Sequence, residues 1–152
     1  MTPFRAADRF DWPALRALIA RACAGMKARI APPSALHRLT AATLARQART
    51  AEIRVIGQPP LACMVLTPRP DALDLGKRAV EPDRHGRGLG RALVTVAEDR
   101  ARALRFSALE LETRVKLHEN QRWFAGLGFQ EVARKAHPGF DRPTTITCRV
   151  AV

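Results

Sequence analysis

A glycine-alternating loop between a strand and a helix constrains this chain more than any other stretch. It runs Val80-Glu-Pro-Asp-Arg-His-Gly-Arg-Gly-Leu-Gly90-Arg-Ala-Leu93, after an apolar strand candidate and before an apolar helical stripe. Backbone N–H groups at a helix amino terminus attract anions, and glycine permits unusual dihedral angles and close approach. Arginines at positions 84, 87 and 91 can add charge-assisted hydrogen bonds. The loop therefore predicts a phosphate-binding site.

The glycine spacing excludes two common classes of phosphate site. A dinucleotide-binding fold would place a third glycine at position 91, which is arginine, and no acidic residue follows at the expected distance. A mononucleotide P-loop would close with Gly-Lys-Ser/Thr, which the sequence lacks. The ligand must belong to another class of phosphate compound.

Hydrophobic periodicity predicts strands and helices that alternate along the chain. We expect helices at 12–26, from Pro32-Pro33-Ser34 to about 49, at 88–105 and at about 119–127, and strands at 4–7, 52–56, 61–67, 73–80, 106–115, 129–133 and 144–150. This order indicates an α/β fold with one mixed sheet of about six or seven strands and helices on both faces. The length fits a single domain over residues 1–152.

Composition narrows the function classes further. The net charge of +12 would attract polyanions, but the basic residues are spread along the chain and do not interleave with aromatic ones, which argues against a nucleic-acid surface. Apolar runs are too short for a membrane span and no secretory signal is recognisable, so we expect a cytoplasmic protein. Three cysteines and four histidines lack metal-site spacing, and we expect no metal.

Two motifs resemble the GCN5-related N-acetyltransferase (GNAT) family. The loop is similar to its Gln/Arg-x-x-Gly-x-Gly/Ala signature, with Gly88 and Gly90 as the two required glycines and His85, a departure, at the first position. Trp123-Phe-Ala-Gly-Leu-Gly-Phe129 resembles the ending of the family's helix after the fifth strand. Together the motifs span residues 74–130. The resemblance implies a GNAT-like fold whose fourth and fifth strands splay apart, so that the pantetheine arm of acetyl coenzyme A fills the gap.

The resemblance also implies an activity and its residues. Acetyl would pass from acetyl coenzyme A to a primary amine, on a small molecule or a protein, by direct attack. Glu112 in Glu112-Thr-Arg114 resembles the Glu-x-Arg of members that acetylate protein amino termini, so it is the expected base, and Glu110 on the same strand face is the alternative. Backbone N–H groups near Val80 would hold the oxyanion. The implied coenzyme-binding residues are Ala79, Val80, Arg84, His85, Gly86, Arg87, Gly88, Leu89, Gly90, Arg91, Asn120 and Phe124.

The chain departs from the family where many members carry a tyrosine that protonates the departing thiolate. That position is Phe124, and the sequence has no tyrosine. The thiolate would leave unaided, or water, His118 or Cys148 would supply the proton. A second departure is Leu117, which replaces an asparagine that holds pantetheine in many relatives; Asn120 is the nearest substitute.

Several alternatives stay open on the sequence. The turn at 137–143 is either a plain hairpin loop or part of the acceptor-site rim. Glu110 and Glu112 favour a cationic acceptor, whereas the overall charge favours an anionic one. A coenzyme-binding sensor without turnover and a basic nucleic-acid-binding module are the competing functions. Exposed strand edges of such a fold would also allow a homodimer.

Overall fold

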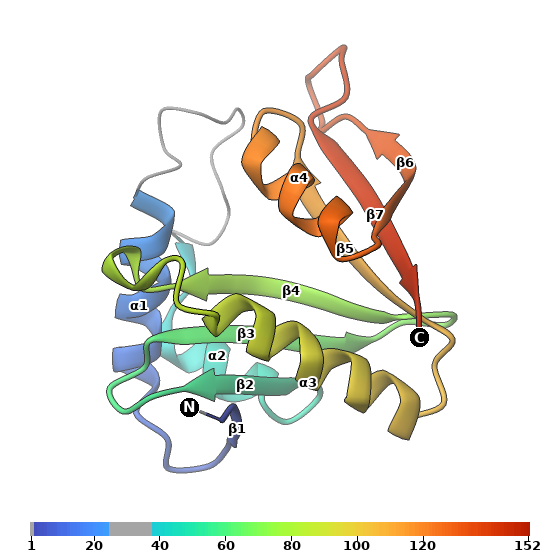
Figure 1. The fold of residues 1–152 in the computed structure, drawn as a ribbon. Helices are drawn as coiled ribbons and strands as arrows, with labels where there is room; N and C mark the ends of the chain where they lie inside the picture. The colour runs from blue at the N-terminus through green and yellow to red at the C-terminus, as the bar shows by residue number, and fades with distance from the viewer. Residues whose placement is uncertain (1, 25–37) are drawn as a thin grey trace.

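The computed structural model describes residues 2–24 and 38–152 of the chain. Its seven strands form one sheet in the order β1-β2-β3-β4-β5-β7-β6 (Figure 1). Only the β4–β5 pairing is parallel, so the sheet is mixed, as expected. The strands are β1 (Phe4–Ala6), β2 (Glu52–Ile56), β3 (Ala62–Pro68), β4 (Leu73–Val80), β5 (Ala108–Arg114), β6 (Gln130–Lys135) and β7 (Thr145–Ala151).

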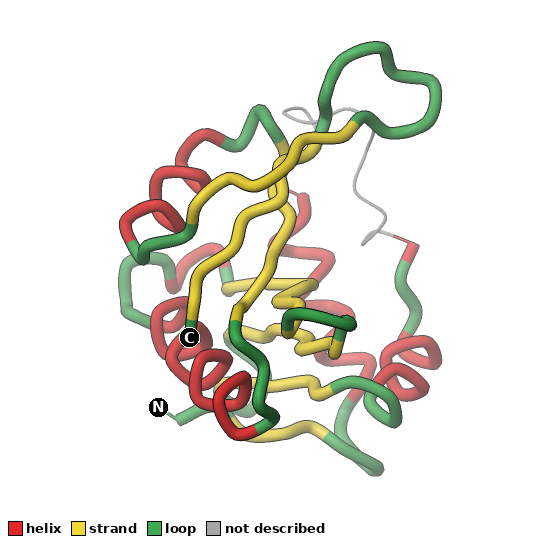
Figure 2. Tube along the Cα trace, turned by 90° about the vertical axis from the view of Figure 1, so that its right-hand side faces the viewer, coloured by secondary structure: helices red, strands yellow, loops and turns green. Residues whose placement is uncertain are grey.

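Helices cover both faces of the sheet, as the sequence predicts (Figure 2). On one face, α3 (Leu89–Ala103) and α4 (His118–Gly126) bury a core that includes Leu75, Leu93 and Leu111. On the other, α1 (Trp12–Ala24) and α2 (Ala41–Gln47) pack on β1 to β4 around a second core. None of the described helices is long and apolar enough to cross a membrane.

Local capping sets where the first two helices begin. Asp11 Oδ1 accepts a hydrogen bond from Ala14 N at 3.0 Å, as expected for the cap of α1. The predicted start of the second helix at Pro32-Pro33-Ser34 lies outside the described residues, but α2 itself begins only at Ala41. There Thr40 and Thr43 form a reciprocal capping box. The expectation of helix at residues 39 and 40 is therefore wrong.

The strands β4 and β5 separate shortly after they meet. Their register contains two residue pairs, Leu73 with Leu109 and Asp74 with Glu110. Figure 1 shows the two strands diverging from this point toward the far end of β4. A bulge contributes to the bend of β4, because Lys77 has a φ of +46° and the β3–β4 register shifts between Cys63 and Val65. The sheet thus contains a wedge between β4 and β5.

Candidate active site

The loop from β4 to α3 has the geometry of an anion site. After the 3₁₀ turn η2 (Pro82–Arg84), Gly86 and Gly88 adopt φ values of +77° and +78°. A Cβ atom at either glycine would meet nothing within 4 Å, so the dihedral angles, and not crowding, require glycine here. The space in front of the loop is open to a ligand.

The amino terminus of α3 faces this loop without a cap. The first hydrogen bond that closes onto Gly88 comes from Ala92 N, at 3.0 Å, and no side chain caps the helix. The three preceding N–H groups of the first turn therefore have no acceptor within the helix. Together with the helix dipole they favour a bound anion.

Four basic side chains gather on the same loop and first helical turn. His85, Arg87 and Arg91 are exposed, and Arg84 is half-buried, 3.7 Å from Asp83. Their placement beside the open N–H groups fits the coenzyme-binding positions that the resemblance implies. The neighbouring positions Ala79 and Val80 form the end of β4, so strand, loop and helix start share one site.

Gly90, in the first turn of α3, lies within van der Waals distance of Trp123 on α4. Its position is helical, and a Cβ atom there would lie 3.4 Å from Cη2 of Trp123 on α4. The aromatic residue that opens the second sequence motif therefore packs against the glycine that ends the first. This contact joins α4 to the start of α3.

Arg78 bridges the wedge and was not predicted from the sequence. Its Nη1 donates to Leu75 O at 2.7 Å and its Nη2 donates to Glu112 O at 2.9 Å, so one guanidinium joins the separated strands. The group also lies over the Phe124 ring, 5.0 Å from its centroid. Burial lowers the pKa of Arg78 to about 10, against the opposing effect of Asp74. The side chain therefore remains cationic at neutral pH.

The α4 face of the wedge holds the other residues considered for the leaving group. Phe124 is buried between the rings of Trp123 and Phe129. Cys148 is also buried, and burial raises the pKa of its thiol. His118, by contrast, is an exposed first residue of α4.

Two further polar residues lie near this face. Asn120 is half-buried in the first turn of α4. The hydroxyl of Thr113, on β5 beyond its pairing with β4, is buried and has no hydrogen-bond partner among the described residues. An orphaned polar atom at this place fits a ligand with amide groups.

The two predicted carboxylates lie on the opposite face, and both are in ion pairs. Glu110 Oε1 is 2.8 Å from Arg149 Nε, and Arg149 also binds Asp71 at 3.0 Å. Glu112 Oε1 is 2.6 Å from Lys135 Nζ, and these two side chains are 43% and 64% exposed. Glu112 is thus accessible to water, whereas Glu110 is held more tightly.

A third carboxylate, Asp74, lies opposite Glu110 in the second of the two residue pairs between β4 and β5. Burial raises the pKa of Asp74, although Arg69 and Arg78 oppose the shift. A single aspartate in an apolar strand gave no sequence signal for this position. The described residues contain no group of three or more His, Cys, Asp or Glu side chains placed to hold a metal ion.

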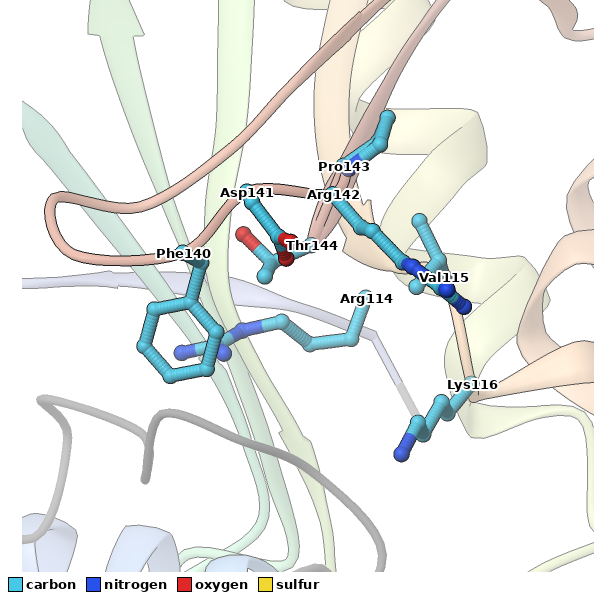
Figure 3. A pocket seen from close by; sticks show the side chains of 8 residues that line it. All are labelled: Arg114, Val115, Lys116, Phe140, Asp141, Arg142, Pro143 and Thr144. Atoms are coloured by element: carbon cyan, nitrogen blue, oxygen red, sulfur yellow. The ribbon is translucent and has the colours of Figure 1, made fainter.

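A pocket of about 330 Å³ opens at the end of β5 (Figure 3). It is lined by the last residue of β5, the two residues after it and the loop between β6 and β7: Arg114, Val115, Lys116, Phe140, Asp141, Arg142, Pro143 and Thr144. Thr144 fixes the loop, since its carbonyl accepts from Val115 N at 3.0 Å and its hydroxyl from His137 N at 2.9 Å. The 137–143 turn is therefore both a hairpin loop and a pocket wall.

Comparison with known proteins agrees with this geometry. The chain is similar to the ribosomal-protein-S18-alanine N-acetyltransferase of Escherichia coli, with 23% identity, 99% of this chain and 94% of that chain covered, and a TM-score of 0.72. It is also similar to a GNAT-family acetyltransferase from Desulfovibrio desulfuricans, with 17% identity, coverage of 99% and 98%, and a TM-score of 0.75. A third is a GNAT acetyltransferase from Elizabethkingia anophelis with acetyl-CoA bound, with 14% identity, coverage of 99% and 97%, and a TM-score of 0.71.

These structural likenesses establish the fold. Comparison with curated proteins gives no match. Residues 16–129 match the family described as the acetyltransferase (GNAT) family, and this span contains the open helix start, the wedge and the Gly-Phe ending of α4. The chain belongs to the GNAT acetyltransferase family.

Proposed function

We propose that this protein is a single-domain enzyme that transfers acetyl from acetyl coenzyme A to a primary amine. The observation that carries the proposal is the uncapped start of α3 beside the β4–β5 wedge. The N–H groups of α3 and the basic side chains around Gly86 and Gly88 would bind the pyrophosphate. Backbone groups on the edge of β4 that faces β5, beyond the two paired residues, together with the Thr113 hydroxyl, would bind the amides of the pantetheine arm.

The same strand end supports catalysis. Bound acetyl coenzyme A supplies a thioester that an amine can attack. Backbone N–H groups around Val80 would stabilise the negative charge that develops on the carbonyl oxygen. Val80 lies in β4 beyond the residues that pair with β5, and alternate peptide groups of this strand end point toward the wedge; the N–H of Glu81 instead donates to Leu61 O at 2.7 Å.

Glu112 is the proposed general base. The hydrogen bond from Arg78 to Glu112 O places this residue across the wedge from β4. Its carboxylate is half-exposed, and the exposed pair with Lys135 is weak enough to open. Glu112 would take the proton of an ammonium acceptor directly or through water. Glu110 is better suited to a structural role, because Arg149 ties it to Asp71.

Arg78 is the proposed stabiliser of the departing thiolate. Phe124 has no proton to give, but a guanidinium lies against its ring and carries a positive charge at the wedge. A nearby cation lowers the pKa of a thiol, so the thiolate leaves more readily without a general acid. Cys148, buried on the same face, is the second candidate and would act as a proton donor.

The first test is calorimetric titration with acetyl coenzyme A. The wild type should bind with a micromolar Kd, and Gly88→Glu should bind at least about a hundredfold more weakly, because a carboxylate at the helix start repels the pyrophosphate. Gly139→Glu is the matched control, since Gly139 has a φ of +86° and equally open surroundings. Loss of binding in both variants, or no binding by the wild type, would refute the coenzyme site.

The competing function is a coenzyme sensor without turnover. The absence of tyrosine from the sequence favours it. Release of free thiol in the presence of amines distinguishes the two, because a sensor would bind acetyl coenzyme A and leave the thioester intact.

A further inference from the structure

The pocket at the end of β5 has a charge that selects its ligand. Its lining includes three cationic side chains, Arg114, Lys116 and Arg142, and one carboxylate, Asp141. Among the described residues, Lys116 and Arg142 take part in no ion pair. Arg114 extends from β5 in the direction of Phe140, Arg142 extends toward Val115, and Lys116 projects from the segment after β5 (Figure 3). The pocket therefore attracts anions.

The neighbouring carboxylates do not reverse this charge. Glu112 is paired with Lys135 at 2.6 Å, and Glu110 with Arg149 at 2.8 Å. Lys135 and Arg149 thus partly neutralise the carboxylates beside the pocket, and Arg149 is shared between Glu110 and Asp71. The sequence left open whether the acidic residues or the basic excess would determine the acceptor. The lining of the pocket, with three cations and one carboxylate, favours an anion.

The pocket lies close to Glu112, the proposed base. It is also small. Arg114 follows Glu112 by two residues on the same strand, so both side chains lie on one face of β5. A volume of about 330 Å³ lies at the lower end of the range for small-molecule sites. An acceptor could place its amine toward Glu112 and a second group among the cations.

We infer that the acceptor is a small primary amine that also carries an oxyanion, a carboxylate or a phosphate, which the cations of this pocket bind. The inference rests on the proposed acetyl transfer and specifies its substrate class. Arginine and lysine both recognise these oxyanions through charge-assisted hydrogen bonds. Phe140 adds an apolar wall for the carbon chain between the two groups.

The test compares amines that differ only in the distant group. With acetyl coenzyme A saturating, kcat/KM is measured for β-alanine, γ-aminobutyrate, δ-aminovalerate and aminopropyl phosphate. Each is compared with the alkylamine and the diamine of equal length. At least one anionic amine should react about tenfold or more faster than both partners, as expected for one charge-assisted contact. The carboxylate and phosphate series identify which oxyanion fits.

Variants locate the effect in the pocket. Lys116→Gln and Arg142→Gln should each raise KM for the preferred anionic amine about tenfold and leave KM for its alkylamine unchanged. Arg9→Gln is the matched control, because Arg9 is an exposed cation before α1, remote from the pocket, and has no ion pair in the described part of the chain. A second measurement without turnover is calorimetric binding of glutarate and propyl phosphate to the coenzyme-bound protein, which both pocket variants should weaken.

The outcomes separate the two proposals. If acetyl coenzyme A binds but neither probe anion does, or if diamines react as well as the anionic amines, the inference is overturned and the acetyltransferase proposal stands. If acetyl coenzyme A itself does not bind, the proposed function fails first.

Discussion

The guanidinium carbon of Arg78 lies 5.0 Å from the centre of the Phe124 ring. The two residues come from β4 and α4 and meet on the wedge face of the sheet. The same guanidinium reaches carbonyl groups of both β4 and β5. A fixed positive charge therefore lies against the ring of Phe124, which has no proton to donate.

Replacement of Arg78 by methionine should lower kcat about tenfold to a hundredfold, because it removes the proposed stabiliser of the departing thiolate. Arg78→Lys keeps the charge and should retain more activity. Steady-state kinetics measure kcat, and calorimetry checks that acetyl coenzyme A still binds. Equal activity of the methionine and lysine variants would contradict an electrostatic role. Thermal melts identify any variant that has lost its fold.

Glu112→Gln should lower kcat about a hundredfold at neutral pH and make the rate rise toward the pKa of the acceptor ammonium, since the amine must then deprotonate without help. The pH profile of kcat/KM for one small amine measures this shift. Glu110→Gln serves as the comparison, because it changes the neighbouring carboxylate on the same strand. A larger loss of kcat in Glu110→Gln than in Glu112→Gln would make Glu110 the general base instead of Glu112.

The contact between Arg21 and Glu81 should hold the end of β4 in place for the coenzyme. Arg21 binds both oxygens of Glu81, at 2.9 and 2.7 Å, and Glu81 directly follows Val80. Arg21→Met and Glu81→Gln should each raise the Kd for acetyl coenzyme A about threefold to tenfold. The double variant should show no further increase, because both single changes remove one contact. Additive effects in calorimetry would mean that the residues act independently.

Glu52 should make folding stability sensitive to acid. Burial alone would raise the pKa of its carboxyl group, but hydrogen bonds from Arg100 and Arg54 outweigh burial and lower the pKa to about 2. A carboxyl group with a lowered pKa contributes stability that is complete above the unfolded value and is lost as pH falls toward the folded one. The loss should therefore occur between about pH 4.5 and pH 2 and amount to roughly 3 kcal/mol.

Urea unfolding at several pH values tests this expectation. Glu52→Gln should destabilise the protein by about 2 kcal/mol at pH 7 and flatten the dependence of stability on pH. Glu98→Gln is the control, because Glu98 makes only an exposed pair with Arg102 at 3.5 Å. An unchanged pH dependence in Glu52→Gln would show that other carboxyl groups govern acid unfolding.

Local patterns were sufficient to predict most of the sheet and the anion loop. The strands β2 and β4 follow from their apolar patterns, and α3 from a long apolar stripe after three glycines. These features depend on neighbours in the sequence. They also determined the family resemblance, which the match over residues 16–129 confirms.

Arg78 could not be predicted in the same way, and the reason is the bulge at Lys77. Simple alternation from Leu73 and Leu75 places Arg78 on the face of Asp74. Two residues of β4 oppose one of β3 at the register shift, so alternation reverses and Arg78 faces α4. Nothing in the sequence predicts the positive φ of Lys77, because lysine is not a residue type that favours this conformation. Similarly, the cationic pocket is lined by the end of β5 and by a loop about 25 residues later in the sequence. Hydrophobic periodicity predicts local structure and gives no information about contacts at this separation.

The wedge also affects how freely this protein can change during evolution. Where β4 and β5 part, the groups offered to an incoming extended molecule are peptide N–H and C=O groups, which every residue except proline supplies in full. Side chains along this edge of the strands can therefore vary while the backbone hydrogen-bonding groups stay in place. A side chain such as Arg78 can therefore be exchanged without removing the peptide groups beside it.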